Sequence, residues 1–180
     1  MSANREPLAP TPSGFQRALA YRWLWGFASV IFIADQLSKQ WITSRLPLNS
    51  YGARGYAIFP GFFNLVHVGN TGAAWSMFSG RSTLLALLAL STLVAIFFWR
   101  KQLGLNHRLP QICFGLLSGG TIGNLFDRVR FGHVTDFLDF HFGDYIFPTF
   151  NVADSAICIG VFSYVLWSLR QPAEPAASGK

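Results

Sequence analysis

The chain has 180 residues, of which 51% are hydrophobic and 12% are charged. In an ordinary soluble domain about a quarter of the residues are charged, so this composition argues against a soluble domain and favours a membrane protein. The formal net charge is +6, but the basic residues form no cluster of the kind that indicates nucleic-acid binding.

Four segments are apolar and long enough to cross about 30 Å of hydrocarbon as helices. We therefore predict an α-helical polytopic membrane protein with one four-span domain over residues 23–169, a polar tail at 1–22 and a second tail at 170–180. The first fourteen residues are polar and contain prolines, and we expect them to be disordered. The four predicted spans are Trp23–Ile42, Ser82–Trp99, Pro110–Phe126 and Val152–Leu169.

The distribution of Lys and Arg predicts the orientation, because short cytoplasmic segments retain these residues. The two tails and the connection after the second span hold eight basic and two acidic residues, which account for the whole net charge. The remaining basic and acidic residues are equal in number. Both termini are therefore expected in the cytoplasm, and the other two connections are expected on the outer side.

The first span is apolar until Asp35, which is followed by Lys39 four residues later. This spacing places both side chains on one face of a helix. One interpretation is an ion pair that fixes the outer end of the helix among its neighbours. The alternative is that the two charges shape or polarise a functional site, since charged residues near hydrocarbon are costly and usually functional.

The connection over residues 43–81 is too long for a simple turn. Its segment YAIFPGFFNLVHV is rich in aromatic and β-branched residues, which predicts short strands at the membrane surface. Asn70 is then followed by Gly72, Ala73 and Ala74, which offer a polar amide in a backbone that other segments can approach closely. The alternative is a loop that merely leads into a short helix.

The third span carries Gly115, Gly119 and Gly123 at intervals of four residues, so they form one stripe on the helix. Small residues at this spacing permit close helix contact in lipid, and packing is the expected role of the stripe. Cys113 and Cys158 both fall inside predicted spans. We interpret them as buried apolar fillers and not as a disulfide or a ligand pair.

Polar residues flank the outer connection at residues 127–150. Asn124, Asp127 and Arg128 share one face at the outer end of the third span, where the arginine can pair with Asp127 or orient a carbonyl or phosphate group. At the start of the fourth span, Asn151 is a predicted N-cap and Asp154 lies in the first turn. Asp154 is thus either a capping acid only or part of a site.

Two carboxylates that share a site cannot both ionise readily, so one holds a proton. The ionised carboxylate then activates a water and the protonated one acts as an acid, which hydrolyses a peptide bond without metal, cofactor or covalent intermediate. Asp136 and Asp154 can form such a pair if the third and fourth spans are neighbours. Asp127 is expected to be ionised and structural, whereas Asp139 and Asp144 are expected to face water in a loop.

Other chemistry has little support in the sequence. The serines lack a GxSxG setting, and the four histidines form no HExxH metal motif. An ion-coupled transporter is an alternative, but no internal repeat is visible. A non-catalytic scaffold leaves the carboxylates without a role, and a presenilin-like GxGD motif lacks its first glycine in HFGD.

Five sequence blocks, in order, are DQLSK (35–39), NTGAAW (70–75), GGTIGNLFDR (119–128), VTDF (134–137) and FNVADS (150–155). With these blocks the chain resembles the lipoprotein signal peptidases, or signal peptidase II, which are aspartyl proteases of the bacterial inner membrane. The blocks cover residues 35–155, which is most of the chain.

The resemblance implies four spans with a small β-rich extracytoplasmic cradle and an active site toward the outer, periplasmic face. It implies cleavage of diacylglyceryl-modified prolipoproteins just before the lipidated cysteine, contact with membrane lipid, and inhibition by the cyclic peptide globomycin. It places the catalytic pair on Asp136 and Asp154. The supporting residues that it implies are Asp35, Lys39, Asn70, Gly120, Asn124, Arg128, Asn151 and Ala153.

Overall fold

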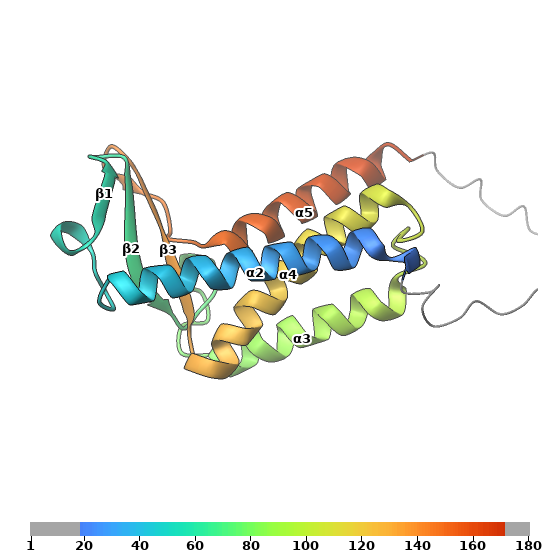
Figure 1. Cartoon of the computed structure of the whole chain (residues 1–180), viewed down its shortest axis with the longest axis horizontal. Coiled ribbons are helices and arrows are strands. Elements are labelled where there is room, and N and C mark those ends of the chain that lie inside the picture. Colours follow the sequence, from blue (N-terminus) through green and yellow to red (C-terminus); the bar gives the residue numbers. More distant parts are fainter. Residues whose placement is uncertain (1–18, 172–180) are drawn as a thin grey trace, which may run out of the picture.

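The computed structural model describes residues 19–171, in which four long helices run side by side and a small antiparallel sheet covers one end (Figure 1). The disorder predicted for the first fourteen residues lies outside this range. The sheet crosses the helix ends, whereas the start of the first helix and the end of the last lie at the opposite end (Figure 1). The helices are α2 (Arg22–Arg45), α3 (Ser82–Trp99), α4 (Arg108–Phe131) and α5 (Val152–Leu169).

Two of these helices, α3 and α5, are long and apolar enough to cross a membrane, with mean hydropathies of 2.1 and 1.6. Their bounds are those predicted for the second and fourth spans. The helices α2 and α4 contain the buried charged residues Asp35, Lys39 and Asp127, and their crossing of the membrane stays a prediction. α4 continues five residues beyond its predicted end, until Gly132 adopts a left-handed conformation with φ 76°.

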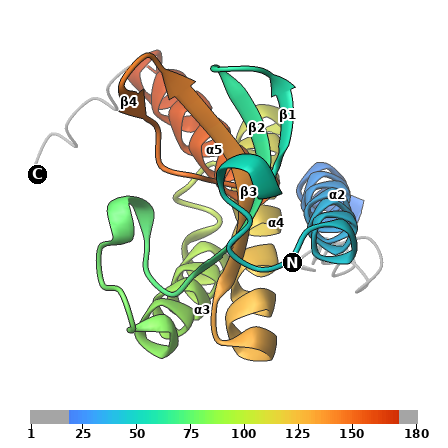
Figure 2. The same cartoon turned by 90° about the vertical axis from the view of Figure 1, so that its left-hand side faces the viewer.

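Helix α4 lies at the centre of the bundle, between α2, α3 and α5 (Figure 2). Its glycine stripe packs against α2, which confirms the predicted packing role. A Cβ on Gly115 would lie 2.8 Å from the carbonyl oxygen of Leu24, and one on Gly119 would lie 2.6 Å from that of Ala28. Gly120 points the other way, where a Cβ would collide with the carbonyl of Ala153 at the start of α5. The glycines thus bring the backbones of three helices together.

The sheet joins the connection between α2 and α3 to the connection between α4 and α5. Its four strands are antiparallel in the order β1 (Tyr56–Phe59), β2 (Phe63–Asn70), β3 (Val134–Phe142) and β4 (Tyr145–Ile146). The predicted strands in the first connection are confirmed as β1 and β2. The pairing of β2 with β3 sets Val68 opposite Asp136, so the sheet fixes where this aspartate lies.

The expectation that Asp139 faces water in a loop is wrong. The segment around it is strand β3, and Asp139 is only 5% exposed. Its Oδ2 accepts a hydrogen bond from Asn64 Nδ2 at 3.2 Å and lies 2.7 Å from His141 Nε2. Strand β3 is held in place by pairing with β2, which lies some 75 residues earlier in the sequence. Asp144, in the turn between β3 and β4, is exposed as expected.

Candidate active site

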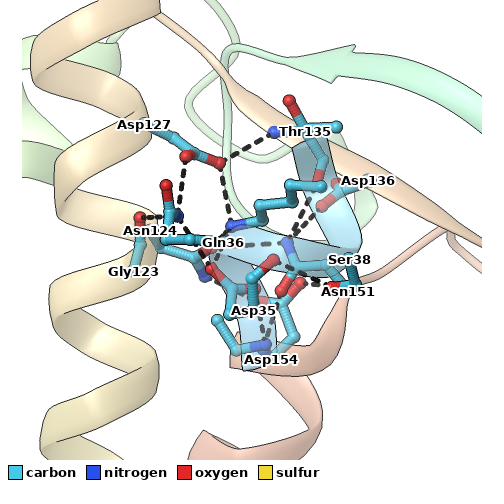
Figure 3. A network of polar contacts seen from close by, with 12 residues as sticks. Asp35, Gln36, Ser38, Gly123, Asn124, Asp127, Thr135, Asp136, Asn151 and Asp154 are labelled. Atoms are coloured by element: carbon cyan, nitrogen blue, oxygen red, sulfur yellow. Dashed lines mark hydrogen bonds and ion pairs between the residues drawn. The ribbon is translucent and has the colours of Figure 1, made fainter. Parts of the chain in front are cut away.

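Asp136 and Asp154 line one cavity of about 410 Å³ at the junction of the sheet and the helices. Asp136 comes from β3, and Asp154 comes from the first turn of α5. Asn151 bridges the two carboxylates: its Nδ2 donates to Asp136 Oδ1 at 2.7 Å, and its backbone N–H donates to Asp154 Oδ2 at 3.2 Å (Figure 3). The two aspartates therefore share a hydrogen-bonding partner as well as a cavity.

The start of α5 gives Asp154 its position. Asn151 is the N-cap, and its Oδ1 accepts from Asp154 N at 2.9 Å while the Asp154 side chain accepts from the Asn151 N–H, which forms a capping box. An N-cap contributes about 1 kcal/mol to helix stability, and the helix N-terminus stabilises a nearby negative charge. The predicted N-cap is confirmed, and Asp154 combines a capping role with a place in the cavity.

The surroundings of Asp136 favour its protonated form. Burial raises the pKa of Asp136 to about 7, and the nearby charge of Asp154 adds to this increase. Hydrogen bonds from Asn70 Nδ2, at 2.9 Å, and from Asn151 Nδ2 oppose the increase but do not cancel it. Because Asp136 is 2% exposed, desolvation is the dominant cause. Near neutral pH this carboxyl group can hold or release a proton.

Asn124 connects Asp154 to a buried cluster of charges. Its Nδ2 donates to Asp154 Oδ1 at 2.7 Å, and its Oδ1 accepts from Lys39 Nζ at 3.0 Å. An ammonium group can only donate hydrogen bonds. Lys39 therefore fixes which end of the Asn124 amide faces Asp154, so the lysine acts on the site through this asparagine.

Lys39 lies between two carboxylates, with its Nζ 2.8 Å from Asp35 Oδ2 and 2.8 Å from Asp127 Oδ2. All three side chains are at most 4% exposed. The predicted pairing of Asp35 with Lys39 is confirmed. The partner suggested for Asp127, its neighbour Arg128, is wrong because Lys39 reaches Asp127 from α2. Asp35 Oδ1 also accepts from Ala153 N at 3.0 Å, which ties α2 to the start of α5.

Arg128 instead binds a carbonyl, which was the other interpretation of its position. Its Nη2 donates to Gly72 O at 2.9 Å, and its Nη1 donates to Asn124 O at 3.3 Å. Asn70 Oδ1 accepts from Gly72 N at 2.8 Å. The loop after β2 is thus held beside the cavity through both backbone polar groups of Gly72. A single 3₁₀ turn, Ala74–Ser76, follows, so the short helix considered for this segment is present as well.

Comparison with known proteins identifies the family of this chain. Residues 27–170 match the family model described as Signal peptidase (SPase) II. The chain belongs to the signal peptidase II family. It is therefore an aspartic-type peptidase of this class, as the resemblance implied.

Relatives in the family span most of the chain. A lipoprotein signal peptidase of Oleidesulfovibrio alaskensis is 44% identical over 75% of this chain and 86% of the relative. The lipoprotein signal peptidase of Yersinia enterocolitica is 37% identical over 88% of this chain and 93% of the relative. A solved bacterial membrane enzyme superposes with a TM-score of 0.72, at 30% identity, over 83% of this chain and 92% of the other. This member of the signal peptidase II family is thus a membrane enzyme.

Three contacts of this signal peptidase II site were not predicted from the sequence. Gln36 Nε2 donates to Asp35 Oδ2 and to Asp127 Oδ1, both at 3.1 Å, and Thr135 N donates to Asp127 Oδ2 at 3.2 Å. Gln36 lies beside Asp35 in the sequence, but nothing there indicates a partner 91 residues away. Thr135 contributes only a backbone group, which leaves no signal in residue type.

The two cysteines of the chain differ in their surroundings. Cys113 is buried as predicted, whereas Cys158 is exposed, so its prediction as a buried filler is wrong. Cys158 lies one helical turn beyond Asp154 and lines the same cavity. Both thiols are free.

Proposed function

We propose that this protein removes the signal peptide from diacylglyceryl-modified prolipoproteins, cleaving just before the lipidated cysteine, with Asp136 and Asp154 as the catalytic pair. The observation that carries the proposal is the bridging of the two carboxylates by Asn151 inside one cavity. Family membership supports the substrate class. The remaining implied residues would act by holding the pair in place.

The cavity combines the two carboxylates with an apolar wall. Its apolar lining includes Trp75, Val134, Phe150 and Ile157. Burial of an acyl chain contributes about 0.8 kcal/mol per methylene group, so an apolar wall beside the dyad favours a substrate that carries lipid. We infer that the diacylglyceryl group and the end of the signal peptide lie against this wall.

The hydrogen bonds suggest which aspartate carries the shared proton. Asp154 accepts from Asn124 Nδ2, accepts from Asn151 N and lies at a helix N-terminus, all of which stabilise a negative charge. Asp136 has a raised pKa of about 7. We therefore assign Asp154 as the base and Asp136 as the acid in the resting enzyme.

The reaction follows from this assignment. Asp154 takes a proton from a water whose oxygen attacks the scissile carbonyl carbon, and Asp136 gives its proton to the carbonyl oxygen as the tetrahedral intermediate forms. The intermediate collapses when the C–N bond breaks. The amine of the cysteine then takes the proton held by Asp154, and the new carboxyl group returns one to Asp136. Each step leaves one proton shared between the two aspartates.

The remaining roles and the topology belong to the same proposal. Asp35, Lys39 and Asn124 would orient Asp154, while Gly120 and Ala153 would let α4 and α5 approach. Asn70 and Arg128 would hold the loop beside the substrate. We infer four crossings in the bacterial inner membrane, both termini in the cytoplasm, and the sheet with the active site on the periplasmic side. Globomycin would compete with substrate for the cavity.

The test is cleavage of a purified lipid-modified precursor, with the product identified by mass. Exchange of Asp136 or Asp154 for Asn keeps the side-chain size but removes the acid or base. We expect each variant to lose at least about 10²-fold to 10⁴-fold in rate, since one general acid or base step contributes this much. Asp144→Asn, in the exposed turn, is the matched control and should retain activity. Near wild-type turnover by a folded dyad variant would refute the mechanism.

The second arm of this test compares lipid-modified and unmodified precursor. The unmodified form should be a far poorer substrate, because the apolar wall then has no acyl chain to bury. Equal cleavage of both forms would show that lipid is no part of recognition.

A further inference from the structure

A second cavity of about 400 Å³ adjoins the active-site cavity on the side of the sheet. We call it the outer groove. Its own lining comes from the outer connections and includes the hydroxyl-bearing residues Tyr51, Thr71 and Ser79. It shares a rim with the first cavity at residues 73–75 and 148–149, where Thr149 adds another hydroxyl group. The volume lies within the range of about 300–1,000 Å³ typical of ligand sites.

The two cavities meet at Asp136. This aspartate lines both of them, whereas Asp154 lines only the cavity on the helix side. A polypeptide whose scissile bond lies between the two carboxylates therefore has one end in each cavity. The end in the outer groove leaves the site between β2 and the loop after it.

The two linings differ in chemistry. The cavity on the helix side has aromatic and aliphatic side chains of its own, such as Phe150 and Ile157, whereas the side chains found only in the outer groove include the hydroxyl-bearing Tyr51, Thr71 and Ser79. Thr71 Oγ1 lies 3.4 Å from Ser79 Oγ and accepts from Gly80 N at 3.1 Å, so the loop holds this hydroxyl pair in place. Each hydroxyl can donate one and accept two hydrogen bonds. The pair therefore retains capacity to bind a polar ligand.

The charge of the residues in the lining of the outer groove limits the class of ligand that it can bind. Asp136 is the one residue of the types Asp, Glu, Lys and Arg in the lining of the outer groove. No Lys or Arg of that lining can pair with an acidic side chain, and burial of an unpaired charge is costly. The groove thus fits an extended, uncharged polar peptide, whose backbone N–H and C=O groups need hydrogen-bond partners when they leave water.

We propose that the outer groove binds the first residues of the mature polypeptide, directly after the lipidated cysteine. This inference rests on the proposed function, because it assumes that the signal peptide and lipid occupy the helix side. The enzyme would then recognise the first residues of the mature segment in addition to the signal peptide and the lipid. It favours neutral polar residues over acidic ones at these positions.

The test uses three lipid-modified peptides with the same signal sequence. The first ends at the cysteine as an amide, the second continues with four neutral polar residues, and the third continues with four residues that include two aspartates. We expect wild-type kcat/KM to be about 10-fold higher for the second peptide than for the first, and to fall again for the third. Ser79→Trp should fill the groove and reduce the ratio between the second and first peptides to below about 2-fold.

Two further variants make the ratio interpretable. Thr43→Trp places the same bulk on an exposed position of α2 outside both cavities, and it should keep the wild-type ratio. Ser79→Leu is a smaller obstruction, used in case the tryptophan prevents folding, and it should give an intermediate ratio. Because each ratio is taken within one variant, differences in yield or overall activity cancel.

The outcomes separate the two proposals. Equal kcat/KM for the first and second peptides in the wild type, or an unchanged ratio in both Ser79 variants, would overturn the outer-groove assignment while cleavage itself stands. Failure of the wild type to cleave any of the three peptides would instead overturn the proposed function.

Discussion

Replacement of Lys39 by Met should destabilise the protein strongly. The lysine Nζ lies 2.8 Å from a carboxylate oxygen of both Asp35 and Asp127, and these side chains are 0% and 2% exposed. Methionine has a similar length but no charge, so two carboxylates would remain buried without their cation. Removal of one partner from a buried ion pair costs about 3–5 kcal/mol. For a chain of this size that corresponds to a decrease in Tm of about 6–20 °C.

The measurement is thermal unfolding of both proteins in the same detergent at neutral pH. Lys101→Met, which removes an exposed lysine after α3, is the control and should change the free energy of unfolding by less than about 0.5 kcal/mol. A decrease of less than 1 kcal/mol for Lys39→Met would refute the reasoning, because it would mean that water or proton uptake compensates the two carboxylates.

The pKa of Asp136 is raised from 3.8 to about 7 in the folded protein. Between these two values the folded state binds a proton that the unfolded state has released, so the free energy of unfolding should fall as pH rises from about 4 to 7. Asp136→Asn should flatten this slope in pH-dependent thermal unfolding, and a slope identical to that of the wild type would contradict the burial of this carboxyl group. Gly119→Ala should destabilise the protein by about 1–3 kcal/mol in unfolding experiments in detergent, since the new Cβ would lie 2.6 Å from Ala28 O. Gly26→Ala is the control, because its Cβ would meet no atom within 4 Å. Equal stability of the two variants would argue against tight packing of α2 on α4. Reporter fusions at Gly104 and after the last residue should report the cytoplasm, while one at Gly143 should report the outer side, and an odd number of crossings would exclude the proposed topology.

Local patterns predicted the helices well. α3 and α5 have their predicted bounds because each is a predominantly apolar run with a polar residue just outside either end. The stripe of Gly115 and Gly119 indicated close packing because spacing along a helix is a local property. The capping role of Asn151 was predictable for the same reason, since an N-cap depends only on the next few residues.

Partners distant in sequence were not predictable in the same way. Asp127 has Arg128 beside it in the sequence, yet its cation is Lys39 on another helix. Strand β3 contains two aspartates, a residue type that is rare in strands, and its stability comes from pairing with β2. Asp139 was assigned to water on this basis, although the same pairing buries it. The resemblance implied both the dyad and the three amides Asn70, Asn124 and Asn151, but not the hydrogen bonds by which these amides hold the dyad.

The hydrogen bonds around the dyad form a chain whose direction is fixed at one end. Lys39 can only donate, so Asn124 presents its oxygen to the lysine and its Nδ2 to Asp154. Asp154 N donates to Asn151 Oδ1, so Asn151 in turn presents its Nδ2 to Asp136. Each amide has one orientation that satisfies both neighbours.

We infer that this fixed direction is the reason why a costly buried ion cluster lies next to the proposed catalytic pair. If either amide turned over, a carbonyl oxygen would face a carboxylate oxygen and repel it. In the proposed mechanism the amides stay in place while a proton moves between Asp136 and Asp154, so no buried amide loses its partner. The charges of α2 and α4 would thus confine proton transfer to these two carboxylates.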